Sequence, residues 1–124
     1  MPYVILCYRD ERVIDAASRE REAQIEARLD AAVATLVEHG GISLAISLLA
    51  STTSTTLRLL RGAPFVCDGP AVESGLQLQH VYLADCGNLD DALAVAGRLA
   101  VLEPGGVYEV RPTETIKGRG QGQE

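Results

Sequence analysis

Tryptophan is absent from this chain of 124 residues, and with one phenylalanine and four tyrosines the aromatic share is only 4%. Proteins that bind single-stranded nucleic acid usually stack bases on such rings. Positive charge is also scarce, because 11 Lys and Arg stand against 17 Asp and Glu and give a net charge of −6. A binder of nucleic acid or of an anionic membrane needs a basic face. We therefore expect neither nucleic acid nor a membrane as a partner.

Cysteine is also sparse, with three residues at Cys7, Cys67 and Cys86 and no C-x-x-C spacing. An odd number without that spacing argues against a disulfide framework or a structural zinc site, and small buried thiols in a reducing compartment are the expectation. No apolar run approaches the ~20 residues of a membrane span, and the apolar start lacks the features of a signal peptide. Phosphate-binding and nucleophile motifs are also missing. We expect a cytoplasmic protein with no metal and no other cofactor.

Hydrophobic periodicity predicts most of the secondary structure. Alternation and β propensity predict strands at residues 3–8, 42–49, 55–61, 64–67, 78–85 and 107–111. Apolar residues at helical spacing predict one helix that Ser18 caps and that Gly40 and Gly41 end, and a second helix that Asn88 caps and Pro104 stops. Residues 114–124 are rich in Gly and Gln toward their end, and we expect a flexible tail after a domain spanning 1–113.

The order of these elements predicts the fold class. Strand, helix, strands, helix and strand match the split βαβ plan of an α+β, ferredoxin-like fold, with two helices on one face and an added hairpin at residues 55–67. The first strand is apolar on both faces, although two helices can cover only one of them. A second copy of the same sheet is the simplest cover for the other face. We therefore expect a homodimer.

Several stretches resemble a known family. The run Val66–Pro70, with Glu73 after it, resembles the Asp-Gly-Pro-Phe box of the YCII-related (DGPF) proteins. Its flanking segments are similar too, at Thr56–Arg58, Tyr82–Cys86, Leu89–Ala92 and Glu109–Pro112. The resemblance implies a dimeric α/β barrel. Some YCII-like relatives use a His-Asp pair for lyase or dehydrochlorinase chemistry, and some DGPF members are encoded beside extracytoplasmic-function sigma factors.

The sequence departs from that family pattern at three places. Ala71 stands where the box has Phe, Gly75-Leu76 replaces a Lys-Glu pair, and Gln79-His80 replaces Gly-Gly before the strand. A site near the box would therefore lose a charged pair and gain an imidazole.

Asp68 and His80 are the candidate catalytic residues. Asp68 has a structural explanation, since Asp-Gly-Pro forms a turn, and a functional one as a general base or ligand anchor. His80 shares an apolar face with Tyr82, where it is either a hydrogen-bonded core residue or an acid–base group paired with Asp68. Whether these two residues meet in space is open at this point.

Arg58, Glu73 and Tyr82 are the candidate ligand-binding residues. Arg58 either pairs with a carboxylate such as Glu73 or binds an anion. Two functions follow from the candidates. The first is a dimeric module that binds a small ligand or a regulatory partner and is non-catalytic or weakly catalytic. The alternative is a cofactor-free lyase or isomerase that uses His80 and Asp68 on a small anionic substrate held by Arg58. The missing Lys-Glu pair slightly favours the first.

Overall fold

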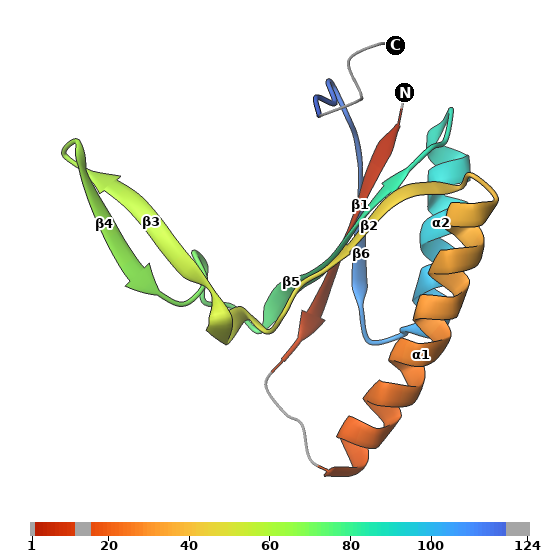
Figure 1. Ribbon diagram of the computed structural model, residues 1–124, viewed down its shortest axis with the longest axis horizontal. Helices are drawn as coiled ribbons and strands as arrows, with labels where there is room; N and C mark the ends of the chain where they lie inside the picture. Colours follow the sequence, from red (N-terminus) through yellow and green to blue (C-terminus); the bar gives the residue numbers. More distant parts are fainter. Residues whose placement is uncertain (1, 12–15, 119–124) are drawn as a thin grey trace.

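The computed structural model describes residues 2–11 and 16–118. These residues form two α-helices, six β-strands and one short 3₁₀ helix at Ser51–Thr53 (Figure 1). In chain order the longer elements are β1 (Tyr3–Asp10), α1 (Ala16–Glu38), β2 (Ile42–Ser47), β3 (Thr55–Leu60), β4 (Ala63–Asp68), β5 (Leu76–Ala84), α2 (Leu89–Leu102) and β6 (Val107–Pro112).

The described strands form an antiparallel four-stranded sheet in the order β2-β5-β1-β6 and a separate two-stranded sheet of β3 and β4. Both helices lie on the same side of the larger sheet (Figure 1). This arrangement is consistent with the ferredoxin-like α+β fold that the sequence predicts. The central strand β1 pairs with β5 on one side and with β6 on the other.

The core lies between the larger sheet and the two helices. Side chains on alternate positions of a strand point to one face, and the sheet contributes Ile5, Cys7, Tyr82 and Ala84 to one buried cluster. The helices contribute residues at helical spacing: Leu29, Leu36, Val95, Ala96 and Leu99. Leu29, Leu36, Ala96 and Leu99 belong to the apolar stripes that the sequence shows, whereas Val95 does not. Leu89 and Leu93 of the stripe expected on α2 are 48% and 49% exposed, so periodicity predicts the buried faces only in part.

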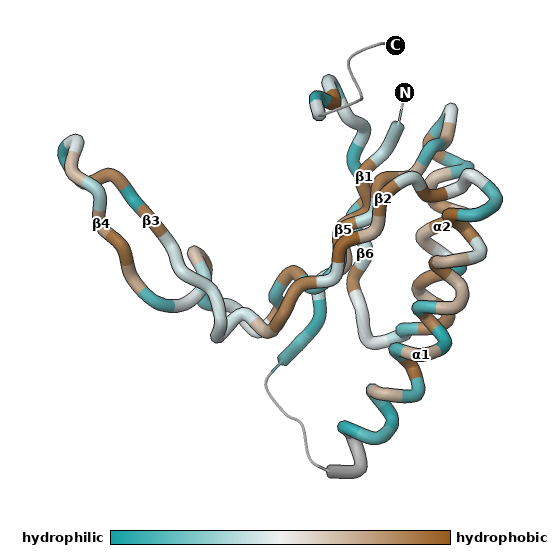
Figure 2. The backbone as a smooth tube through the Cα atoms, in the orientation of Figure 1, coloured by the Kyte–Doolittle hydropathy of each residue, from teal (hydrophilic) through white to brown (hydrophobic). Residues whose placement is uncertain are grey.

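The opposite face of the larger sheet carries no helix in the described structure (Figure 1). Val4 and Leu6 of β1 pair with Leu83 and Val81 of β5 and alternate with the buried residues of the same strands, so they point to this face. On the edge strand β2 the corresponding residues Leu44 and Ile46 are exposed. We call the surface formed by these six and Tyr8 the open face. Figure 2 shows hydrophobic residues along β2 and β5.

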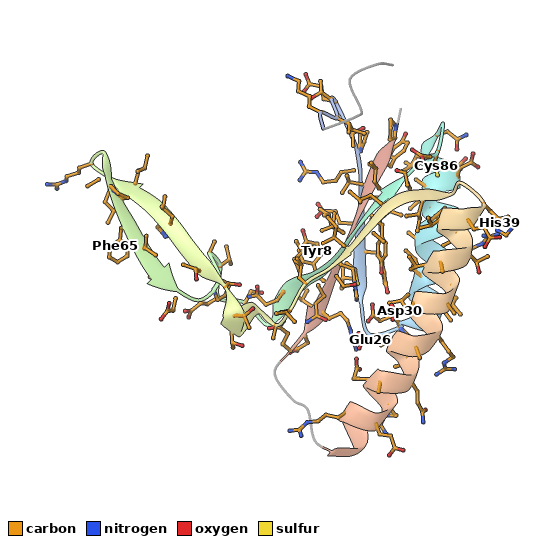
Figure 3. The ribbon with its side chains drawn as sticks, viewed as in Figure 1. Tyr8, Glu26, Asp30, His39, Phe65 and Cys86 are labelled. Carbon is orange, nitrogen blue, oxygen red and sulfur yellow. The ribbon has the colours of Figure 1, made fainter. Side chains whose placement is uncertain are left out.

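The hairpin of β3 and β4 projects away from the rest of the chain (Figure 1). The sequence predicts an added hairpin at residues 55–67, which is confirmed. Its reversal lies at Arg61 and Gly62, which both have positive φ. Large apolar side chains of the hairpin are exposed on both strands: Leu57, Leu59, Leu60, Phe65 and Val66. Phe65 lies far out on this arm in Figure 3.

The ends of the helices and strands can be compared with the ends that the sequence predicts. Asn88 caps α2, since its side chain accepts a hydrogen bond from the Asp91 amide at 2.9 Å, and Gly40 follows α1 with φ of 83°. Both predictions are confirmed. The cap at Ser18 is wrong, because α1 already begins at Ala16. The strands also shift by a few residues: β1 continues to Asp10, β5 begins at Leu76, and β2 ends at Ser47.

The structure describes only residues 114–118 of the predicted tail, which spans residues 114–124. Thr113 is tied to the N-terminal segment, because its amide and hydroxyl both donate to the carbonyl oxygen of Pro2, at 3.0 and 2.8 Å. Residues 119–124 of the tail lie outside the described residues, as do residues 12–15. The flexibility of the tail therefore stays a prediction.

Candidate functional site

Asp68 and Glu73 lie together at the base of the hairpin. Asp68 ends β4, and both residues line an open cavity of about 530 Å³ together with Thr52 and Gln77. The turn after Asp68 has the predicted geometry, since Gly69 adopts φ of 102°, a region that glycine reaches at little cost. The backbone of Gly69 binds Ser54 and Thr56, with its amide donating to the Ser54 carbonyl at 2.7 Å and its carbonyl accepting from the Thr56 hydroxyl at 2.7 Å.

Arg58 lies on the exposed surface of β3. Its Nη2 donates to the carbonyl oxygen of Ala71 at 2.8 Å, so it ties the hairpin to the segment that follows the Asp-Gly-Pro turn. Glu73, the carboxylate proposed from the sequence, is not the partner in this contact. Arg58 is also not among the residues that line the cavity of Asp68 and Glu73.

His80 and Tyr82 lie on the helix-covered face of β5. Their rings are stacked, with centroids 5.8 Å apart and planes inclined by 22°. Tyr82 is only 2% exposed and belongs to the core, and burial raises the pKa of its hydroxyl. It therefore offers almost no surface to a ligand. The structure brings these two residues together, but it gives His80 a carboxylate partner other than Asp68.

That partner is Glu103, the residue at the C-cap of α2, which is 4% exposed. Its Oε1 lies 3.6 Å from Nε2 of His80, and its Oε2 lies 3.2 Å from Nη1 of Arg9. Cys7 Sγ donates to Oε1 at 3.5 Å, and the hydroxyl of Tyr108 donates to the Glu103 backbone oxygen at 3.0 Å. One buried carboxylate thus connects β1, β5 and β6 with the end of α2.

Arg9 extends this network to α1. Its guanidinium forms two hydrogen bonds with the carboxylate of Glu22, one of them from Nη2 to Oε1 at 2.8 Å. Nε of Arg9 is enclosed and has no hydrogen-bond partner among the described residues. On the other side of the network, Oγ of Ser47 lies 3.0 Å from Nδ1 of His80. We call this set the buried network, after its buried centre at Glu103 and Cys7, whereas Glu22 and Ser47 at its two ends are half-exposed and exposed. Its members are Ser47, His80, Glu103, Arg9, Glu22, Cys7 and Tyr108.

A cavity of about 610 Å³ adjoins the network between the end of β1, the start of α1 and the segment after β2. Arg9 and Glu22 form part of its wall. Glu11 and Gln79 add polar groups and are themselves bonded, with Gln79 Nε2 donating to Glu11 at 2.9 Å. The apolar part of the wall comes from Ala23, Ile25, Leu48, Leu49 and Ala50. We call this space the Arg9 cavity. Its size and mixed lining are typical of small-molecule sites.

Comparison with known proteins agrees with this architecture. A model of the YCII-related domain matches residues 1–117. The chain belongs to the YCII-related domain family. An uncharacterised protein of Rhizobium meliloti (strain 1021) is 40% identical over 118 residues, which cover 94% of this chain and 95% of that protein. The family resemblance inferred from the sequence is thus confirmed, and the relative assigns no activity to the domain.

Two properties of this YCII-related domain concern partners and metals. Neither helix of the described structure is long and apolar enough to cross a membrane. Within residues 2–11 and 16–118, no group of three or more His, Cys, Asp or Glu side chains is arranged to hold a metal ion.

Most residues of the buried network in this YCII-related domain were not predicted from the sequence. Glu22, Glu103 and Tyr108 form no motif, because they are remote from one another and from Arg9 in the chain. One signal was present: Arg9 continues the alternation of Ile5 and Cys7, which places it on the covered face once β1 is extended beyond Tyr8. A charged side chain on a covered face requires a buried partner.

Acidification should destabilise the YCII-related domain through Glu103 and Glu22. Burial alone would raise the pKa of Glu103, but the hydrogen bond and charge of His80 and the charge of Arg9 outweigh it and lower the pKa. The hydrogen bond from Arg9 is the main cause that lowers the pKa of Glu22. Stability from both groups is therefore fully present above the unfolded pKa, near 4.5, and is lost as pH falls through the folded values.

The measurement for this pH dependence is a series of melting temperatures between about pH 7 and pH 3, for the wild type and for Glu22→Gln. We expect the melting temperature of the variant to fall less steeply on acidification, because one of the two carboxylates no longer takes up a proton. Identical slopes for the two proteins would contradict the prediction.

Cys7 should resist alkylation in the native protein. It is fully buried, and burial raises the pKa of its thiol to about 12, whereas Cys67 and Cys86 are partly exposed. Since the thiolate is the nucleophile, iodoacetamide should label Cys67 and Cys86 well before Cys7. Peptide mass mapping over time measures the order, and denatured protein with all three sites labelled is the control. Equal rates at Cys7 and Cys67 would show that the core around β1 is open.

Proposed function

We propose that this YCII-related domain is a homodimeric module that binds a small organic ligand in the Arg9 cavity. The observation that carries the proposal is the buried network itself. Burying charged groups costs free energy, so a charged network beneath two helices argues for a role beyond stability when it borders a cavity of suitable size. The network fixes Arg9 in the wall, and Glu11 and Gln79 add further polar groups.

We propose that two copies of this module pair through the open face as a dimeric α/β barrel. The open face is apolar on the central strands, and Leu44 and Ile46 are 52% and 41% exposed on β2. A second copy packed on this face through a two-fold axis would cover the same residues on both chains. We expect the dimer to act in the cytoplasm, where its three free cysteines stay reduced. A regulatory protein partner remains the other candidate ligand, with the exposed apolar hairpin as its contact surface.

Acid–base catalysis is the second candidate function, and a specific contact favours it. His80 lies between the hydroxyl of Ser47 at 3.0 Å and the carboxylate of Glu103 at 3.6 Å. A carboxylate that orients an imidazole is a recurring feature of acid–base sites. In this version Glu103 takes the place that Asp68 has in the sequence-based hypothesis. Asp68 and Glu73 then form a separate candidate site at the base of the hairpin.

A library of small fluorinated compounds, screened by ligand-observed NMR, tests the binding function. Ala23→Trp adds a ring to the wall of the Arg9 cavity, and Thr52→Trp adds the same ring to the cavity that Asp68 lines. Both positions are exposed, so both variants should fold. We expect ligands whose signals are lost with Ala23→Trp and retained with Thr52→Trp. The reverse pattern would move the site to the hairpin base, and no ligand at all would refute the binding function.

A further inference from the structure

Arg9 and Glu22, which form an ion pair, differ in how far their side chains are exposed to solvent. The side chain of Arg9 is 17% exposed, and that of Glu22 is 36% exposed. The second carboxylate on Arg9, from Glu103, is only 5% exposed and contacts three other side chains of the buried network, Cys7, Tyr108 and His80. Glu103 therefore belongs to the fixed interior, whereas Glu22 is a half-exposed carboxylate on the cavity side of the guanidinium.

The protein groups leave Arg9 incompletely satisfied. A guanidinium has five N–H donors, and its fork geometry matches a carboxylate. Glu22 accepts from Nη1 and Nη2, Glu103 accepts from Nη1, and Nε has no partner among the described residues although it is enclosed. An optimised structural ion pair would leave no such donor unpaired. Nη1 and Nη2 are the atoms that Glu22 occupies, and Glu22 is the more exposed of the two carboxylates on Arg9. A ligand carboxylate can therefore reach these two nitrogens by replacing Glu22, whereas Nε stays enclosed.

We propose that the Arg9 cavity binds a small monocarboxylic acid, whose carboxylate displaces Glu22 from Arg9. This rests on the proposed binding function of the same cavity. One carboxylate replaces another on the guanidinium, so the charge next to Arg9 does not change, and Glu22 turns to water. Arg19 and Arg21 also line the cavity, but with Arg9 they stand against four acidic residues, Asp10, Glu11, Glu22 and Glu26. The wall is therefore net negative, and a phosphate dianion would add more charge to it than a monocarboxylate does.

The rest of the cavity indicates the body of the ligand. Ile25, Leu48 and Leu49 supply apolar surface opposite the charged end, and Leu49 is 80% exposed when nothing covers it. Burying such a side chain against an apolar ligand is favourable. A short aliphatic or aromatic acid satisfies both ends, and its carboxylate determines the orientation. Glu22 then acts as an internal competitor, which lowers the apparent affinity of the ligand by the fraction of time that Arg9 is free.

The experiment titrates ¹⁵N-labelled protein with benzoate and, as an uncharged probe of the same shape, with benzamide. Three variants accompany the wild type. Glu22→Gln removes the competitor, and Glu26→Gln removes the same charge from the same helix and the same cavity wall. Arg9→Lys keeps the positive charge beside Glu103 but loses the fork. Affinities come from the shifts of backbone amides that line the cavity, and melting curves establish that each variant is folded.

We expect benzoate to bind Glu22→Gln about tenfold more tightly than the wild type, which is the scale of one charged hydrogen-bonded pair. Glu26→Gln should change its affinity by at most about twofold through the weaker long-range field. When Arg9→Lys is combined with Glu22→Gln, most of the tenfold gain in benzoate affinity should be lost. Equal gains for the two Gln variants, or equal binding of benzamide, would overturn displacement while leaving a ligand cavity. If neither benzoate nor benzamide shifts the amide signal of a cavity residue in any variant, both the displacement and the proposed binding function are refuted.

Discussion

Glu103→Gln should lower the free energy of unfolding by about 2–3 kcal/mol, toward the lower end of what removal of one partner from a buried ion pair costs. The carboxylate of Glu103 is nearly inaccessible and contacts Arg9, His80 and Cys7. Glutamine retains the shape of the side chain but not its charge, so the buried guanidinium keeps only Glu22 as a counter-charge. Urea denaturation at neutral pH measures the loss.

The matched control for this prediction is Glu38→Gln at the end of α1. Glu38 is exposed and lies outside the open face, so the same substitution removes a charge without leaving a buried cation. Its cost should stay within about 0.5 kcal/mol, as for most surface substitutions. Equal losses for Glu103→Gln and Glu38→Gln would show that the buried network contributes little to the fold.

Leu6→Arg should convert the proposed dimer into a monomer. Leu6 lies on the central strand β1 opposite Val81, in the middle of the open face. A guanidinium there would be buried against apolar side chains of the second copy without a partner, and truncations at interface centres already cost up to hundredfold or more in affinity. We expect the dissociation constant to rise by at least about hundredfold. Sedimentation velocity at micromolar concentration measures it.

Val101→Arg is the control for the dimer prediction. Val101 lies on α2 and is 81% exposed, so it introduces the same side chain at an apolar surface position outside the open face. The variant should sediment like the wild type. A wild type that is monomeric, or a Leu6→Arg variant that remains dimeric, would contradict the face-to-face arrangement.

Local rules predicted the parts of the fold that depend on short segments. The Asn88 cap and the positive φ of Gly40 and Gly69 each follow from neighbouring residues, and all three are present. The helical stripes identified most of the helix residues that meet in the core, but they missed Val95 and included the exposed Leu89 and Leu93. Ser18 was placed wrongly, because a capping residue type also occurs inside helices, and the sequence holds no sharper signal for the start at Ala16.

The candidate site was predicted less well, since its contacts are long-range. His80 was selected because it shares a strand face with Tyr82, and the structure shows in addition that the two rings are stacked. Its carboxylate partner was expected near the Asp-Gly-Pro turn, whereas the structure supplies Glu103 from the far end of α2. Only the packing of α2 across the sheet brings residues 9, 80 and 103 together. No spacing along the chain encodes that contact.

The most direct test of the account is a crystal structure of the protein soaked with a library of small carboxylic acids. We expect ligand density in the Arg9 cavity, with the carboxylate of the ligand on Arg9 and the apolar part of the ligand against Leu49. The side chain of Glu22 should have moved away from Arg9. Density confined to the hairpin base beside Asp68 and Glu73, or no density in the Arg9 cavity at saturating ligand, would contradict it.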